Sequence, residues 1–432
     1  MRFLGVGHYN DLASMYHSMA ARGHEVRVFV EDKEYQEIFR GMLQFTQDWR
    51  RELAWIREAD NEGIIIFESA DKGYEQEALR KEGFRVIGGS ELGDRLEGDR
   101  EFGQQALRAV GLKTASSHVF KCFNEAISLL ERSGGRFVLK FNGTNSPRTR
   151  NYIGQLDDSA DMLAVLKLYR DHSDDRAAPD FVLMEYVQGV EVGVGAYFNG
   201  QNFLDTVCID FEHKRFFPGD LGELTGEMGT IVSYRGAQKL FNATLSHMRG
   251  LLSESGYCGY INVNLIVNEH GIWPLEFTSR FGYPGFAICE TLHLEPWETI
   301  FRRMLDKNSL ALPTKDGYAA GVVLTVPPFP YSDGYEKLSK GEPICFRPGL
   351  TEKDLAGLHF AEIEKVGEQL VTSGATGYVG VVTGQGQTIA HARDEAYRLA
   401  RHVIVPNLRY RSDIGERLIS HDLQALNTLG WL

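Results

Sequence analysis

The segment Gly259–Pro284, GYINVNLIVNEHGIWPLEFTSRFGYP, constrains the fold more than any other part of the sequence. Apolar and polar residues alternate on both sides of its midpoint, and this period of two predicts two strands, each with one apolar face. Glu269-His270-Gly271 suits a three-residue hairpin loop with Gly271 in the left-handed conformation. Such a loop pairs Asn268 with Ile272, so the segment is predicted to be a β-hairpin.

Counting back from this loop places polar side chains together on one face of the hairpin. Asn264 is expected opposite Glu276. Asn262 is expected opposite Thr278, and Arg280 follows on the same face, while Val, Leu, Trp and Phe fill the other. Carboxylate and amide oxygens suit a hard cation such as Mg²⁺, and a guanidinium suits phosphate oxygens. An ordinary half-exposed hairpin fits the same pattern, and the pattern alone leaves both interpretations open.

The composition, 43% apolar and 24% charged residues, is typical of a soluble globular protein, and 432 residues allow about three domains. The net charge of −13 argues against a general binder of nucleic acid or anionic membranes, although a local basic pocket remains possible. Five scattered cysteines without a Cys-x-x-Cys spacing predict reduced thiols. The N-terminus does not resemble a signal peptide, and no apolar run approaches the ~20 residues of a spanning helix. We therefore expect a cytoplasmic protein.

The first hundred residues predict a parallel sheet. Apolar strands are separated by helices and lie at Arg2–Val6, His24–Val30, Gly63–Phe67 and Phe84–Ile87. Strands alternating with helices favour parallel pairing with right-handed crossovers, and such sheets bind ligands at the carboxyl ends of their strands. The loops at Gly5–His8 and Glu68–Ala70 are therefore candidate substrate loops. Gly5-x-Gly7 by itself favours a tight turn over a dinucleotide site, because the third glycine of that motif is missing.

Two later loops combine features of binding segments. Asn142–Asn151 is polar and basic and follows the strand Arg136–Lys140 directly, so it either folds over phosphates or is a solvated connector. Asp210–Gly229 combines charged residues with four glycines and predicts a binding loop shaped by its backbone. His213 within it receives no catalytic role, since a lone histidine is usually a hydrogen-bonded structural residue. A helix over Gly236–Glu254 is predicted to follow.

Beyond the hairpin, Trp297–Leu305 predicts a helix, and Pro313 with Gly317 marks a boundary. The remaining residues predict short strands at Ala319–Val326 and Tyr378–Thr383 and a helix over Ala390–Val403. This part is expected to be a small mixed domain without a catalytic cluster of its own.

Five motifs in one order resemble the ATP-grasp superfamily, and within it the phosphoribosylamine–glycine ligase family of purine synthesis. They are Arg136-Phe-Val-Leu-Lys140, Met184-Glu-Tyr-Val-Gln-Gly-Val-Glu191, the segment His213–Gly229, Leu275-Glu-Phe-x-x-Arg-Phe-Gly-x-Pro284 and Arg409-Tyr-Arg-Ser-Asp-Ile-Gly415. The resemblance implies an α/β ATP-grasp fold in which two subdomains grip ATP. It implies an N-terminal parallel domain at 1–98, an ATP-grasp domain at 99–312 with its smaller lid at 120–195, and a mixed C-terminal domain at 313–432.

The same resemblance implies roles for individual residues. Adenine would meet Glu185 and the backbone of Tyr186 and Val187, and the ribose would meet Glu191. The ATP phosphates would be held by Lys140 and Arg100. The remaining roles are Mg²⁺ binding by Asn264, Glu276 and Thr278, catalysis by Arg280 and Lys214, and substrate binding by Arg215, Asp220, Thr225, Gly226 and Gly229.

The implied reaction is ADP-forming amide synthesis. A substrate carboxylate attacks the γ-phosphate of ATP to give an acyl phosphate, and an amine then displaces phosphate, while the protein acts by positioning and by neutralising charge. The expected partners are therefore a small acid, such as glycine or another amino acid, and a small amine, with Mg²⁺ and ATP as cofactors. Neither a nucleic-acid polymer nor a membrane is expected, and the chain would be a monomer or homodimer.

Several segments depart from the family pattern and bear on the substrate. Gly7-His-Tyr-Asn-Asp11 replaces the glycine-rich loop that contacts the sugar phosphate, and Tyr283-Pro284-Gly285 replaces Asp-Pro-Glu. Asn142–Asn151 replaces the glycine- and alanine-rich ATP flap. The neutral Asn264 and Thr278 predict weaker Mg²⁺ binding before ATP arrives. The leading hypothesis is a ligase with an altered amine substrate. The alternatives are an authentic phosphoribosylamine–glycine ligase and a non-catalytic nucleotide-binding protein.

Overall fold

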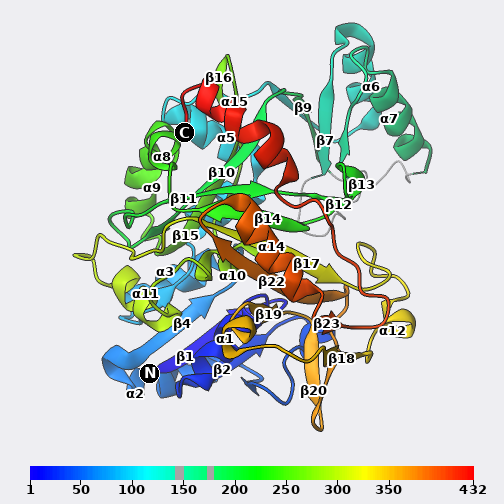
Figure 1. Ribbon diagram of the computed structural model, residues 1–432. Helices are drawn as coiled ribbons and strands as arrows, with labels where there is room; N and C mark the ends of the chain where they lie inside the picture. Colours follow the sequence, from blue (N-terminus) through cyan, green and yellow to red (C-terminus); the bar gives the residue numbers. More distant parts are fainter. Residues whose placement is uncertain (142–149, 173–179) are drawn as a thin grey trace.

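A computed structural model describes residues 1–141, 150–172 and 180–432 of the chain. In Figure 1 a parallel sheet (blue) lies at the bottom, a long antiparallel sheet crosses the middle, and a small lobe (teal) stands at the upper right. The predicted loop Asn142–Asn151 lies almost entirely outside the described residues.

The N-terminal sheet is parallel, with the strand order β3-β2-β1-β4-β5. Its strands are β1 (Arg2–Gly7), β2 (Glu25–Val30), β3 (Gln44–Phe45), β4 (Gly63–Phe67) and β5 (Val86–Ile87), and the helices of this region are α1 (Ala13–Ala21), α2 (Leu53–Glu58), α3 (Gly73–Lys81), α4 (Glu91–Gly98) and α5 (Arg100–Ala109). β4, GIIIF, is buried along its whole length, as a strand covered on both faces requires. The predicted parallel sheet is confirmed, and β3 is an edge strand too short to show a period.

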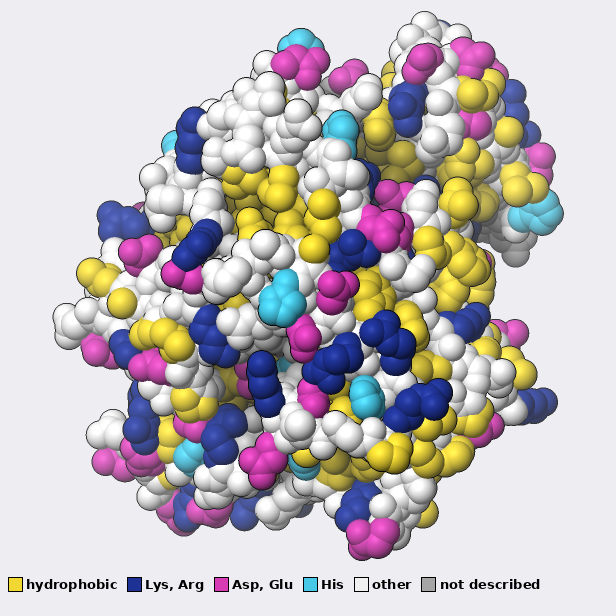
Figure 2. Space-filling view, in the orientation of Figure 1, with side chains coloured by type: hydrophobic (Ala, Val, Ile, Leu, Met, Phe, Trp, Pro, Cys, Tyr) yellow, Lys and Arg dark blue, Asp and Glu magenta, His cyan; other side chains and the backbone are white. Residues whose placement is uncertain are grey.

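The small lobe, called the lid below, is an antiparallel sheet with two helices. Its strands run in the order β6-β9-β7-β8, and its elements are β6 (Ser117–Phe120), α6 (Phe123–Ser133), β7 (Phe137–Phe141), β8 (Tyr152–Ile153), α7 (Ala160–His172) and β9 (Phe181–Glu185). α6 and α7 share one apolar core with Phe137, Leu139 and Phe181, so both helices cover the same face. In the space-filling view the lid stands clear of the body at the upper right, with a notch between them (Figure 2).

The central sheet has eight strands in the order β16-β15-β10-β11-β14-β17-β22-β19. They are β10 (Val190–Phe198), β11 (Cys208–Glu212), β14 (Gly229–Ser233), β15 (Gly259–Asn268), β16 (Gly271–Thr278), β17 (Tyr318–Thr325), β19 (Leu358–Phe360) and β22 (Tyr378–Gly386). Because β14 pairs with β17, backbone hydrogen bonding continues across the boundary expected near residue 312. The three domain ranges therefore stay a prediction, based on chain order.

The turn of the β15–β16 hairpin is shorter than predicted. Asn268 pairs with Gly271 instead of Ile272, so the predicted loop is wrong by one residue, and the turn contains Glu269 and His270 alone. Gly271 has a φ of 122°, in the region that favours glycine.

A β-bulge restores the predicted pairing further along the hairpin. Leu265 pairs with Pro274, and the next residue, Asn264, pairs with Glu276, so Leu275 is the extra residue on β16. The opposition of Asn264 and Glu276 is therefore confirmed despite the wrong loop. That of Asn262 and Thr278 is confirmed as well.

The bulge also changes the face on which two apolar residues lie. Trp273 and Leu275 were predicted on the buried face with Phe277, but they pack against Val182 and Met184 of the lid strand β9. A regular strand would have sent them to the opposite side of the sheet, because side chains alternate at a period of two. The hairpin therefore contributes apolar contacts to the lid beside its polar row.

Three further predictions need correction. The expected loop Asp210–Gly229 contains the end of β11 and a small hairpin of β12 (Arg215–Phe217) and β13 (Leu221–Leu224), whose short strands have no clear period. The helix expected at Gly236–Glu254 is interrupted at Thr244, which has φ −136° and ψ −90° and whose Oγ1 donates to the Leu240 carbonyl. The helix expected to reach Val403 ends earlier, and Val403 joins a strand instead.

The remaining elements complete the body. The helices are α8 (Gln238–Ala243), α9 (Arg249–Glu254), α10 (Gly285–Glu290), α11 (Trp297–Leu305), α12 (Tyr335–Leu338), α13 (Glu352–Leu355), α14 (Ile389–Ala400) and α15 (Leu423–Thr428). A last sheet, β20-β21-β18-β23, contains β18 (Pro343–Phe346), β20 (Ile363–Val366), β21 (Gln369–Thr372) and β23 (Val403–Ile404). Among the helices of the described ranges, none has the length and apolar character needed to cross a membrane.

We expect Leu265→Ala to destabilise the protein by about 3 kcal/mol or more, because Leu265 is completely buried in β15 and its truncation leaves a cavity. The free energy of unfolding from urea denaturation measures this. Leu294→Ala is the matched control, since Leu294 is 61% exposed, and should change stability by less than ~0.5 kcal/mol. Equal losses in both variants would contradict the assignment of β15 to the core.

Candidate functional site

The carboxylate of Glu276, on β16, lies among basic side chains from three other parts of the chain. Its Oε2 accepts hydrogen bonds from Arg100 Nη1 and, at 3.0 Å, from Lys140 Nζ. Lys214 Nζ lies 4.0 Å from its Oε1. Arg100 begins α5, Lys140 belongs to the lid strand β7, and Lys214 follows β11. The structure therefore brings together four residues that were assigned to the site from sequence.

The charges of this cluster control its ionisation. Burial raises the pKa of Glu276, but the charges of Lys140, Arg100 and Lys214 outweigh burial and hold that pKa well below its usual range. Burial lowers the pKa of Lys140, and the charge of Glu276 opposes this effect. The side chains of Glu276 and Lys140 are 30% and 19% exposed, so a ligand in solution can reach both.

Two more carboxylates surround Lys214. Its Nζ lies 2.6 Å from Glu191 on β10 and 3.2 Å from Glu212 on β11. Burial lowers the pKa of Lys214, yet the charges of Glu191, Glu212 and Glu276 raise it well above its usual value. Asn264 Nδ2 donates to Glu212 at 3.4 Å and so joins the polar row to the cluster.

Glu212 and Asp210 belong to the site but were missed in the sequence. The pattern Asp210-Phe-Glu212 has the period of a strand and could have indicated that both acids face one side of the sheet. Asn262 Nδ2 donates to Asp210 at 2.6 Å. Burial, and then the charge of Glu212, raise the pKa of Asp210 to about 7. Gly193 on β10 makes room for Asp210, because a Cβ there would lie 2.1 Å from Asp210 Oδ1.

The residues expected to meet adenine lie where the lid joins the body. The N–H of Glu185 donates to the Ser116 carbonyl and that of Tyr186 to the Arg136 carbonyl, each at 2.9 Å. Among the described residues, the N–H of Val187 has no hydrogen-bond partner and is open to an acceptor such as a purine nitrogen. The apolar cluster of Val182, Met184, Trp273 and Leu275 adjoins this segment.

Arg280 lies beyond the end of β16 and pairs with α4. Its Nε donates to Glu97 at 3.1 Å, and the charge of Glu97 raises the pKa of Arg280. Glu97 also accepts the N–H of Ser279 at 2.8 Å, which fixes the loop that carries Arg280. The predicted contact of Arg280 with a transferring phosphate stays a prediction.

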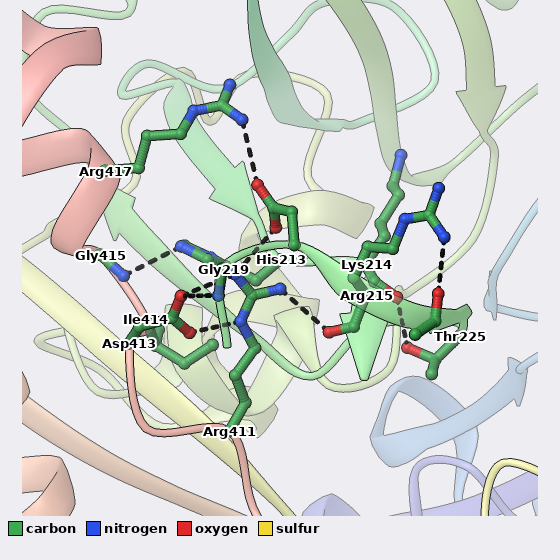
Figure 3. Close-up of polar contacts among 12 residues, drawn as sticks. His213, Lys214, Arg215, Gly219, Thr225, Arg411, Asp413, Ile414, Gly415 and Arg417 are labelled. Atoms are coloured by element: carbon green, nitrogen blue, oxygen red, sulfur yellow. Dashed lines mark hydrogen bonds and ion pairs between the residues drawn. The ribbon is translucent and has the colours of Figure 1, made fainter. Parts of the chain in front are cut away.

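The loop after Lys214 is held by the C-terminal segment, as Figure 3 shows. Arg411 donates to Asp220 at 2.8 Å, and Asp413 accepts the N–H of Gly219 at 2.8 Å. Arg215 donates to the Gly222 carbonyl at 2.6 Å.

Thr225 in the same loop donates to the Lys214 carbonyl at 2.8 Å. The polar groups of Arg215, Asp220 and Thr225 therefore shape the loop itself. Direct substrate contacts of these three residues, and of Gly226 and Gly229, stay a prediction.

His213 belongs to the same contact between loop and C-terminal segment. Its Nε2 accepts the N–H of Gly415 at 3.0 Å, so the neutral ring carries its proton on Nδ1. Burial, and then the charge of Arg411, lower the pKa of His213 to about 4. The structural role predicted for His213 fits these contacts.

Comparisons with known proteins show which fold this geometry belongs to. Residues 98–286 match the model of the phosphoribosylglycinamide synthetase ATP-grasp (A) domain. The crystal structure of phosphoribosylamine–glycine ligase from Thermotoga maritima is similar over 96% of this chain and 100% of that chain, with a TM-score of 0.69 and 22% sequence identity. The chain has the ATP-grasp fold. The predicted fold class and the predicted resemblance are confirmed.

Two further comparisons support the assignment of this ATP-grasp chain. A phosphoribosylamine–glycine ligase from Halalkalibacterium halodurans is 27% identical over 385 residues, which cover 84% of this chain and 87% of that protein. The biotin carboxylase domain of Hydrogenobacter thermophilus 2-oxoglutarate carboxylase, crystallised with MgADP and bicarbonate, is similar over 100% of this chain and 95% of that domain, with a TM-score of 0.65 and 12% identity. The predicted class, ATP-grasp carboxylate–amine ligases that use ATP and Mg²⁺, is confirmed.

The side chains present fit Mg²⁺ brought by a triphosphate. Glu276, Glu212 and the amide of Asn264 supply oxygen donors, which Mg²⁺ prefers. Thr278, on the same face as Glu276, adds a hydroxyl. Within the described ranges no group of three or more His, Cys, Asp or Glu side chains is arranged to hold a metal ion by itself. Weak binding of the metal before ATP arrives stays a prediction.

We expect Glu276→Gln to reverse the effect of Mg²⁺ on nucleotide binding. The variant frees Arg100 and Lys140, so ATP in the presence of EDTA should bind more tightly than to the wild type. MgATP should bind at least about tenfold more weakly, because the metal loses one of its direct ligands. Isothermal titration calorimetry with and without Mg²⁺ measures both. Glu269→Gln, in the exposed turn of the same hairpin, is the control and should leave both affinities unchanged.

We expect the stability of the protein to fall between pH 6.5 and pH 4 partly through His213. The pKa of His213 is about 4 in the folded protein and about 6.5 unfolded, so its contribution is complete above pH 6.5 and is lost as pH falls through the folded value. The loss is up to ~3 kcal/mol. Denaturation of wild type and His213→Gln at both pH values measures it, and the variant should lose correspondingly less stability.

His270→Asn, in the exposed hairpin turn, is the control for this experiment and should show the pH dependence of the wild type. An identical pH dependence of stability in His213→Gln and the wild type would refute the contribution of His213.

Proposed function

We propose that this protein is an ATP-dependent, ADP-forming carboxylate–amine ligase that acts through an acyl phosphate. The observation that carries the proposal is the pairing of Glu276 with Arg100 and Lys140, because it joins the lid to the body at a position suited to a triphosphate. The family match over residues 98–286 and the relatives named as ligases support the same function.

Glu276 occupies the position of an anion between two cations. A triphosphate entering the notch would compete with this carboxylate for Arg100 and Lys140. Glu276 would then be available to a divalent ion bound to the phosphates, together with Glu212 and Asn264. Mg²⁺, when bound, would neutralise charge on the phosphates. The protein thus exchanges one set of ion pairs for another and leaves no buried charge unpaired.

The other residues position the reactants. Val187 N–H would meet the purine edge beside the apolar cluster of Val182 and Trp273. Glu191 would accept hydrogen bonds from the ribose hydroxyls. Lys214, held by Glu191 and Glu212, would remain charged and balance the developing negative charge of the transferring phosphoryl group.

The reaction has two steps. An oxygen of the substrate carboxylate attacks the γ-phosphorus and ADP leaves, which gives the acyl phosphate. The substrate amine, once its ammonium form has released one proton to solvent, attacks the acyl carbon. The C–O bond to phosphate breaks, and the nitrogen releases a second proton. The phosphate leaves with the oxygen atom that came from the acid, so the product is an amide.

The amine is the undetermined part of this proposal. The relatives that carry the name phosphoribosylamine–glycine ligase favour that activity as the second candidate. Two segments argue against it. The family's sugar-phosphate loop is replaced by Gly7-His-Tyr-Asn-Asp11, and its Asp-Pro-Glu motif is replaced by Tyr283-Pro284-Gly285. We therefore propose a ligase whose amine differs from phosphoribosylamine.

We expect ADP and phosphate to appear only when MgATP, an acid and an amine are all present. With acid labelled by ¹⁸O in its carboxyl group, one ¹⁸O atom should appear in the released phosphate, which mass spectrometry detects. ADP release coupled to a spectrophotometric assay identifies the reacting pair among amino acids and amines, with phosphoribosylamine plus glycine included. Release of unlabelled phosphate with amide formation would exclude the acyl phosphate, and Glu276→Gln should reduce turnover at least about 100-fold.

A further inference from the structure

A cavity separate from the Glu276 cluster lies between the N-terminal sheet, the loop after β16 and the C-terminal part of the chain. Its volume is about 220 Å³, below the size of pockets that hold drug-sized ligands. Asp11 comes from the loop after β1, Tyr283 from the loop after β16, and Glu362 from the connection between β19 and β20. The cavity is therefore suited to a small molecule held by three separate segments.

The walls of this cavity are aromatic. Four tyrosines line it, in two pairs with edge-to-face rings: Tyr9 with Tyr35, whose ring centroids are 4.9 Å apart, and Tyr283 with Tyr378, whose centroids are 5.4 Å apart. Aromatic faces carry negative charge density and attract cations. The rings alone would also accept an apolar group, so the polar atoms decide the ligand.

The charged side chains that line the cavity are acidic. Asp11 and Glu362 supply two carboxylates, and among the described residues that line the cavity none is basic. Glu362 is held in place by Thr376 Oγ1 and, at 2.8 Å each, by the N–H groups of Thr376 and Gly377. It is 6% exposed, and burial raises its pKa to about 7, so a bound cation would favour its charged form.

Asn10 adds an acceptor without a partner. Its side chain is 2% exposed and lines the cavity, and its Nδ2 donates to the Ile38 carbonyl at 3.1 Å. Its Oδ1 is buried and has no hydrogen-bond partner among the described residues. A buried acceptor left unsatisfied is costly, and a ligand that donates hydrogen bonds would satisfy it.

We propose that this cavity binds the amine substrate in its ammonium form, as a small organic cation without a phosphate group, between Asp11, Glu362 and the tyrosine rings. An ammonium offers only donors, which match the carboxylates and Asn10, and its positive charge matches the ring faces. A phosphate would meet two carboxylates, and no basic side chain is among the described residues that line the cavity. The inference rests on the proposed ligase and names the class of its amine.

The position of the cavity fits this role. Tyr283 follows Arg280 by three residues on the loop after β16, and Asp11 lies close enough to Arg280 for its charge to contribute to that side chain's raised pKa. The cavity therefore adjoins the residue assigned to the transferring phosphate. An amine bound there would lie on the carboxyl side of both β1 and β16.

Binding of defined cations tests the inference. The probes are benzylammonium and butylammonium chloride, their neutral counterparts benzyl alcohol and butanol, and O-phosphoethanolamine as an amine that carries phosphate. Isothermal titration calorimetry on the full chain, without nucleotide or acid, should detect the two ammonium ions and show at least tenfold weaker binding of the other three. Asp11→Asn and Glu362→Gln should each weaken ammonium binding at least tenfold.

Glu336→Gln, on the exposed helix α12, is the control and should bind the ammonium ions like the wild type. Asp11→Asn keeps the inference testable if Glu362→Gln does not fold. Equal binding of alcohols and ammonium ions, equal affinity in the Asp11 variant, or tighter binding of O-phosphoethanolamine would overturn the inference.

The two proposals fail separately. Ammonium binding without ADP formation in any mixture of acids and amines would support the cavity and contradict the ligase. Release of ADP with phosphoribosylamine and glycine, with no ammonium binding, would support the ligase and overturn the cavity assignment.

Discussion

The ion pairs of Glu276 connect the parts of the molecule that must act together. This carboxylate lies on the central sheet, and its partners come from the helix that begins at Arg100 and from the lid strand that carries Lys140. Opposite charges held this close hold the lid in a fixed position against the body. Because the side chains of Glu276 and Lys140 are partly exposed, an anionic ligand can compete for the same cations. The lid therefore contacts the body through these ion pairs at the site, beside the apolar contacts of Trp273 and Leu275.

The architecture was predictable where the chain follows simple periods. β4 is a continuous apolar run and β15 alternates, so their positions and the pairing of Asn264 with Glu276 followed from sequence. The bulge at Leu275 was not predictable, because a two-residue turn plus one extra residue gives the same pairing at Glu276 as a three-residue loop. The pairing of Asn268 with Gly271, and the apolar contacts of Trp273 and Leu275 with the lid, distinguish the two.

Contacts between side chains that lie far apart in the sequence were the part of the site that could not be predicted. Arg280 pairs with Glu97, 183 residues away, and nothing local to either residue indicates this contact. Glu212 was not predicted as a site residue, because the charged residues that follow it obscure the pattern at the end of β11. The loop after Lys214 was recognised by its glycines, but the bond of His213 to Gly415 depends on how the C-terminal segment returns.

The two ends of the reaction path have opposite electrostatic character. At one end lie the cations assigned to the ATP phosphates, Arg100, Lys140 and Lys214, and at the other, in the proposed amine cavity, Asp11 and Glu362 lie among tyrosines. A substrate with both a negative and a positive charge would be attracted to both ends. An acid and an amine that each carry one charge would each bind preferentially at the end of opposite charge. Electrostatic interactions are stronger where water is excluded. This preference would therefore be larger in the buried cavity than at the partly exposed phosphate site. Substrate choice in this fold can therefore change through the loops after β1 and β16 while the phosphate chemistry around Glu276 stays the same.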